Sequence, residues 1–99
     1  MKTKQEILKL LGGIPEDVYD SICSSFFSEA KTKVEGMAEA IAASDFLVIA
    51  QQAHAIKGSA SNLHQDAIAE AAKSIEAAAK GQDMAKVQQC FLILKSAFQ

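Results

Sequence analysis

The chain has no tryptophan, no arginine, one proline and two cysteines among its 99 residues. Without arginine, and with a formal net charge of −2, it lacks the basic surface that nucleic-acid binding requires. No apolar run approaches the roughly 20 residues of a membrane span, and no signal-peptide core follows the N-terminus. Cys23 and Cys90 are isolated within helical patterns, so we expect buried, reduced thiols and no disulfide. These absences favour a cytoplasmic protein that binds neither nucleic acid nor membrane.

Turn and capping residues divide the chain into one short and four longer helices. Thr3 and Glu6 have the spacing of a capping box, and Gly12-Gly13 ends the short helix that it opens. Short connections between the longer helices favour an all-α fold, an antiparallel four-helix bundle with the short helix as a lid. We therefore expect a single domain over 1–99. The helices are expected at about 3–11 for the lid and at about 15–43, 45–62, 66–80 and 83–98 for the bundle.

Each long helix carries its own boundary signals. Pro15 is expected as the first residue of its helix, and Gly81 as the residue that closes the third long helix. The expected N-caps of the other three are Ser44, Asp66 and Asp83. In the longest helix a stripe at helical spacing is expected to face the core, interrupted by Gly36, where a local bend would fit: Tyr19, Ile22, Cys23, Phe26, Phe27, Ala30, Val34, Met37 and Ile41.

The 45–62 helix carries one histidine with a lysine three residues on and a glycine four on. Residues three and four apart are neighbours on a helix surface, so His54, Lys57 and Gly58 form one patch. An imidazole can accept a phosphoryl group, and a nearby ammonium can offset its charge. A glycine inside an exposed helix costs about 1 kcal/mol relative to alanine, and close approach by a partner would explain it. The patch predicts a phosphoacceptor His54 with a phosphate-stabilising Lys57.

His54 follows Ala53 and therefore lies about 100° around the helix from the buried stripe. We expect it on an exposed flank, with apolar residues of the preceding helix beside it. The hydroxyls of Ser59 or Ser61 could donate hydrogen bonds to a phosphoryl group there. The same line of the helix holds the residues that we expect to dock a partner: Leu47, Gln51, Gly58 and Ser61.

The segment Ala53-His54-Ala55-Ile56-Lys57-Gly58-Ser59 resembles the motif of histidine phosphotransfer (HPt) domains of multistep two-component signalling. Ser44-Asp45-Phe46 matches the start of that family's histidine-bearing helix, and Ile75-Glu76 matches its later leucine-glutamate pair. The likeness extends from Pro15 through Phe98. One departure is His64-Gln65, which stands where the family usually has glycine at a turn that would admit a left-handed backbone.

The resemblance implies a phosphocarrier, not an enzyme in its own right. His54 would exchange a phosphoryl group with the aspartate of a receiver domain, in a response regulator or a hybrid sensor kinase. Lys57 would stabilise the phosphohistidine, and Gly58 would let the receiver's loops approach. The Mg²⁺ would belong to the receiver, so no metal or other cofactor is expected on this chain.

Other readings of the same residues stay open. The bundle could be a helical docking or adaptor module that binds signalling proteins without phosphate chemistry. His64 is expected to be a turn residue, since no lysine or glycine follows it at the spacing seen after His54. A metal site joining the two histidines is disfavoured by their ten-residue separation and by the lack of further ligands nearby. We expect a monomer, and the starting methionine favours a free-standing protein.

Overall fold

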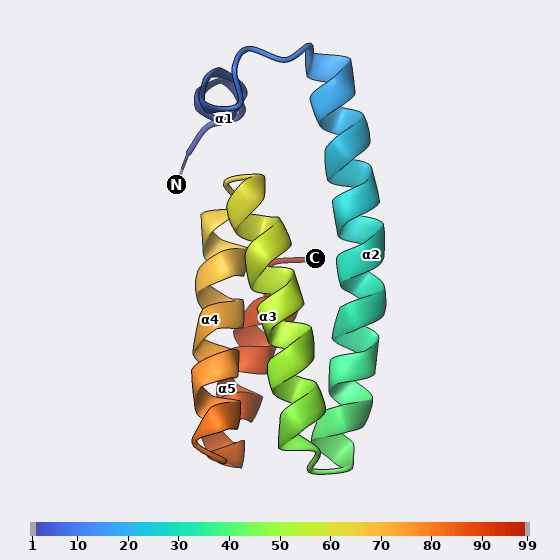
Figure 1. Ribbon diagram of the computed structural model, residues 1–99, viewed down its shortest axis with the longest axis vertical. Coiled ribbons are helices and arrows are strands. Elements are labelled where there is room, and N and C mark those ends of the chain that lie inside the picture. Colours follow the sequence, from blue (N-terminus) through green and yellow to red (C-terminus); the bar gives the residue numbers. More distant parts are fainter. Residues whose placement is uncertain (1, 99) are drawn as a thin grey trace.

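The computed structural model describes residues 2–98, which form five helices in an elongated bundle (Figure 1). The 27-residue helix α2 spans almost the full 42 Å length of the molecule, as its rise of 1.5 Å per residue requires. The last four helices alternate in direction, which confirms the expected antiparallel four-helix bundle. The helices are α1 (Lys4–Leu10), α2 (Glu16–Ala42), α3 (Phe46–Asn62), α4 (Asp66–Lys80) and α5 (Met84–Ser96).

The main core lies between α3 and its neighbours. Helix α3 packs between α2 and α4, and α5 packs mainly on α4. Small residues line the contact of α3 with α4, because Ala53 and Ala60 on one side and Ala72 on the other are fully buried. The two helices can therefore approach closely, so that side chains of one reach the other. The largest fully buried side chains are Met37, Ile49, Ile56, Ile75, Val87 and Leu94.

The three turns of the bundle share one hydrogen-bonding pattern. In each turn one residue has a left-handed backbone, and the next amide bonds to a carbonyl five residues back, as in a Schellman motif. The left-handed residues are Ser44, His64 and Gln82, with φ of 53°, 55° and 55°. His64 thus takes the conformation that glycine would adopt more cheaply. Gly81, expected to close its helix in this way, instead has φ of −85°.

Several N-caps lie one residue away from the expected position. Because Ser44 is the left-handed residue, Asp45 is the N-cap of α3, and its carboxylate accepts a hydrogen bond from the Val48 amide. Gln65 is likewise the N-cap of α4 in place of Asp66, and Pro15 is the N-cap of α2, not its first helical residue. The expected caps at Thr3 and Asp83 are confirmed by their hydrogen bonds to backbone amides.

Burial departs from the expected stripe where α2 extends beyond the other bundle helices (Figure 1). Ile22, expected in the core, is 42% exposed because α1 covers only the other side of this part of α2. Cys23 and Cys90 are free thiols, as expected, but only half-buried. At Gly36 an added Cβ would lie 3.4 Å from the side-chain amide nitrogen of Gln52 on α3, so it would meet only the end of a flexible side chain.

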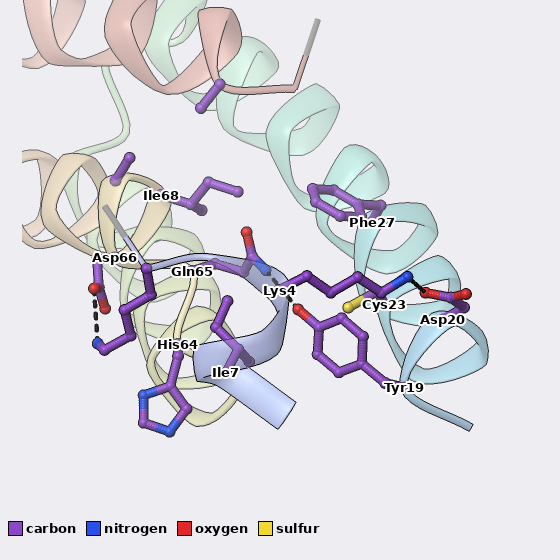
Figure 2. Close-up of a pocket in the computed structure, with 13 residues that line it drawn as sticks. Lys4, Ile7, Tyr19, Asp20, Cys23, Phe27, His64, Gln65, Asp66 and Ile68 are labelled. Atoms are coloured by element: carbon purple, nitrogen blue, oxygen red, sulfur yellow. Dashed lines mark hydrogen bonds and ion pairs between the residues drawn. The ribbon is translucent and has the colours of Figure 1, made fainter. Parts of the chain in front are cut away.

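Helix α1 lies across the end of the bundle and is held by a small cluster of its own, in which Ile7 and Leu8 pack against Tyr19 of α2. Lys4 pairs with two carboxylates at the start of α2, at 2.8 Å each. Figure 2 shows the hollow of about 530 Å³ beneath α1, where the Gln65 side chain donates a hydrogen bond to the Tyr19 hydroxyl. The ends of α2, α3 and α4 are thereby tied together around α1.

Candidate functional site

The His54 ring stands on the exposed side of α3. Its side chain is 69% exposed, whereas Ala53 before it is fully buried. Ile49, Ile56 and Ala60 complete the buried stripe that fixes the rotation of α3 on the core. The predicted flank position of His54 follows from this rotation.

Glu76 of α4 joins the polar side chains of the site. One of its oxygens, Oε2, lies 3.0 Å from Nδ1 of His54, and the other, Oε1, accepts a hydrogen bond from Nζ of Lys57 at 2.9 Å. Lys80, one turn further along α4, lies 3.2 Å from Oε2. Glu76 itself is only 8% exposed and is the one buried charged residue in the described part of the chain. A single carboxylate thus links the histidine of α3 to two lysines.

The charges around Glu76 determine its ionisation. The Lys57 ammonium, helped by Lys80 and opposed by burial, lowers the pKa of the Glu76 carboxyl to about 2. At neutral pH this carboxylate is ionised and can only accept hydrogen bonds, so the proton of the neutral His54 ring belongs on Nδ1. The lone pair of the ring then lies on Nε2, and none of the described residues forms a hydrogen bond with that nitrogen. The site presents a nucleophilic nitrogen at an exposed surface.

The residues expected to dock a partner are all exposed on α3, and Leu47 is 69% exposed. A Cβ added at Gly58 would meet no atom within 4 Å, so packing inside this chain does not require glycine there. The surroundings of His54 differ from the expected ones in one respect. The side chain that contacts His54 comes from α4, whereas Ser59 lines a small hollow with Phe26 and Lys33 of α2.

Glu76 was predicted only as part of the pattern that resembles the family, and Lys80 was not predicted as a site residue. A signal for Glu76 was present. It lies four residues after Ala72 and three before Ala79, so it falls on the buried stripe of α4. A carboxylate on such a stripe needs charged partners to offset its desolvation. Lys80 follows it at the i, i+4 spacing of a helical ion pair.

Within residues 2–98, no group of three or more His, Cys, Asp or Glu side chains is arranged to hold a metal ion. In the same range, no helix is long and apolar enough to cross a membrane. His64 lies in the α3–α4 turn, and Lys57, Glu76 and Lys80 gather around His54 alone.

On this antiparallel helical bundle, the exposed His54 ring lies beside a buried carboxylate and two lysines. The model of the Hpt domain matches residues 21–99, and the chain therefore belongs to the Hpt domain family. Membership places the chain in histidine phosphotransfer of two-component signalling, among carrier modules that interact with receiver domains. Helix α1 and the first residues of α2 lie outside the match. No curated protein and no solved structure matches the chain.

Proposed function

We propose that Nε2 of His54 carries the phosphoryl group and exchanges it with the aspartate of a receiver domain. One observation supports this assignment above the others. The ring is 69% exposed while its Nδ1 lies 3.0 Å from the Glu76 carboxylate, so Nε2 is accessible and carries the lone pair when the ring is neutral. The cognate receiver would belong to a response regulator or a hybrid sensor kinase.

The transfer needs no base on this chain. The Nε2 lone pair attacks the phosphorus of an aspartyl phosphate, and the bond between phosphorus and the carboxyl oxygen breaks. The aspartate leaves as a carboxylate with that electron pair, and the Nδ1 proton of His54 stays in place. In the return direction a receiver aspartate attacks the phosphorus, and neutral imidazole leaves. The receiver would supply the Mg²⁺ that offsets charge on the transferring group.

Lys57 is proposed to stabilise the phosphorylated ring. A phosphoryl group on histidine brings a charge of about −2 to the surface, by analogy with other phosphorylated side chains. The Lys57 ammonium lies 2.9 Å from Glu76, whose other oxygen is 3.0 Å from the ring, so the lysine is already beside the acceptor. Its side chain is only 33% exposed, which limits the conformational freedom lost when it contacts phosphate.

The exposed line of α3 is proposed as the receiver-docking surface. Gly58 adjoins His54 on this line and leaves it free of side-chain bulk, which lets the receiver's loops come close. We expect one copy of the chain to suffice, since all four polar groups of the site come from one chain. The remaining members of the surface are Leu47, Gln51 and Ser61.

Phosphoryl transfer from a panel of phosphorylated receiver domains, read by intact mass, tests the proposal. The expected result is a gain of one phosphate that is lost in His54→Gln and retained in His64→Gln, the matched control. Binding of a receiver without transfer to the unmodified chain would refute phosphotransfer and favour the phosphate-independent docking module. Phosphate retained in His54→Gln would refute the assignment of the acceptor.

A further inference from the structure

We propose that Glu76 is a positioning residue whose negative charge keeps the phosphorylated His54 ring protonated at Nδ1, the form that gives up its phosphoryl group. This inference rests on the proposed function and concerns the phosphorylated state. Glu76 would thus affect how fast the phosphorylated chain donates its phosphoryl group, in addition to determining which ring nitrogen accepts it.

The charge on the ring changes during the proposed step. The form of the ring that attacks phosphorus is the neutral one, with its proton on Nδ1 and its lone pair on Nε2. After Nε2 has bonded to phosphorus the ring is a cation, because the Nδ1 proton has not left. The Glu76 carboxylate lies 3.0 Å from Nδ1 and is only 8% exposed, so water screens this attraction less than it would at an open surface. Glu76 therefore favours the cationic phosphorylated ring.

The proton on Nδ1 decides how good a leaving group the ring is. With the proton present, breaking the N–P bond returns the electron pair to Nε2 and releases neutral imidazole. Without it, the same bond would have to release an imidazolate anion, which is far more basic and leaves much more slowly. A carboxylate that holds this proton therefore maintains the donor form at a pH where an unassisted phosphorylated ring would lose it.

Three charged groups surround the ring, and they act in opposite directions. Glu76 of α4 attracts the ring cation, whereas Lys57 of α3 and Lys80 of α4 repel it and share the same carboxylate. A phosphoryl group on Nε2 offers both lysines a second anion, which leaves more of the Glu76 charge to the ring. Within the described residues, no hydrogen bond or ion pair joins His54 to α2 or α5.

The test loads the chain with the small donor phosphoramidate, removes the donor, and follows loss of phosphate to water by intact mass from pH 5 to 10. Glu76→Gln keeps an oxygen that accepts from Nδ1 but removes the charge. We expect the midpoint of its pH–rate profile to lie about one pH unit below that of the unmodified chain. Above both midpoints the variant should lose phosphate about tenfold more slowly, and in acid the two rates should agree. Glu70→Gln, which removes an exposed charge from the same helix, should leave the profile unchanged.

The outcomes separate the two proposals. If His54 of the unmodified chain takes no phosphate from phosphoramidate or from any receiver, the proposed function is wrong. If it takes phosphate and Glu76→Gln shows the same midpoint as the unmodified chain, only the role of Glu76 is wrong. Should Glu76→Gln fail to fold, Lys80→Gln provides the second test. Removal of this competing cation should raise the midpoint, and an unchanged or lower midpoint would overturn the inference.

Discussion

Gly58 is the position at which fold stability and phosphotransfer should respond in opposite directions. It lies inside α3, is exposed, and has open space where a Cβ would be. Gly58→Ala should therefore stabilise the fold by about 0.5–1 kcal/mol, the difference in helix propensity between the two residues. For a chain of this length that corresponds to a rise in melting temperature of roughly 4 °C.

Gly58→Gln should retain part of this gain, because glutamine is a good helix former whose side chain can extend into solvent. The same side chain would lie over the proposed docking surface, one helical turn from His54. A receiver would have to displace it before its aspartate could reach Nε2. We expect transfer from a receiver to fall by at least about tenfold, which corresponds to roughly 1.4 kcal/mol of lost interaction.

Thermal unfolding followed by circular dichroism and initial rates of transfer from a phosphorylated receiver would measure both effects. Phosphorylation by phosphoramidate, which needs no docked protein, should proceed at the normal rate in Gly58→Gln. Ala85→Gln is the matched control, since it places the same side chain at an exposed position of α5, which packs mainly on α4. A lower melting temperature for Gly58→Ala would show that the fold requires this glycine. Unchanged transfer in Gly58→Gln would refute the docking argument.

Three further predictions concern stability. The Glu76 carboxyl, with its pKa lowered from 4.5 to about 2, stabilises the folded chain above pH 4.5 and should lose this contribution as the pH falls towards 2. The partner lysines Lys57 and Lys80 are 33% and 69% exposed, so water screens their pairs with Glu76 and limits the loss to about 1 kcal/mol. Urea unfolding from pH 6 to 2 should show this loss in the unmodified chain but not in Glu76→Gln. Met37→Ala removes a fully buried side chain and should cost about 2–5 kcal/mol in the same assay, so a loss below about 1 kcal/mol would contradict the core described. His64→Gly should stabilise the fold by about 0.5–1 kcal/mol, because the backbone of residue 64 is left-handed, with φ of 55°. Gly81→Ala is the control, since φ is −85° there and alanine should cause no comparable strain. A melting temperature lowered by His64→Gly would count against strain at that turn.

The helices of this chain could be predicted because apolar residues recur at helical spacing in nearly every segment. The 66–80 helix was predicted with the bounds that α4 has, and the final helix ends two residues earlier than expected, at Ser96. The starts were harder to place. Residue preferences favour glycine at a left-handed position, but hydrogen bonds from the next backbone amide hold Ser44 and Gln82 in that conformation. Local propensity alone therefore put some caps one residue away.

The site could be predicted only where its residues lie on one helix. His54 and Lys57 are three residues apart, so helical geometry alone places them together. Their link through Glu76 depends on which helix lies beside α3 and at what height along it. These are properties of the packed bundle, and the neighbours of His54 were expected on the preceding helix, α2, instead of on α4. Because periodicity gives the buried face of each helix but not the register between two helices, Glu76 was not assigned a role.

Small alanine side chains on α4 allow Glu76 to reach the residues of α3. Glu76 has a short side chain, yet it reaches both His54 and Lys57 on the neighbouring helix at about hydrogen-bonding distance, 3.0 and 2.9 Å. It can do so because Ala72 and Ala79, one turn to either side of it, are buried against the core and hold α4 close to α3. Larger side chains at these positions would move the helices apart and leave the carboxylate in water, where its pairs with lysine would contribute little. The alanine content of α4, which by composition alone indicates only a helix, thus determines the distance at which a buried charge can act on an exposed histidine.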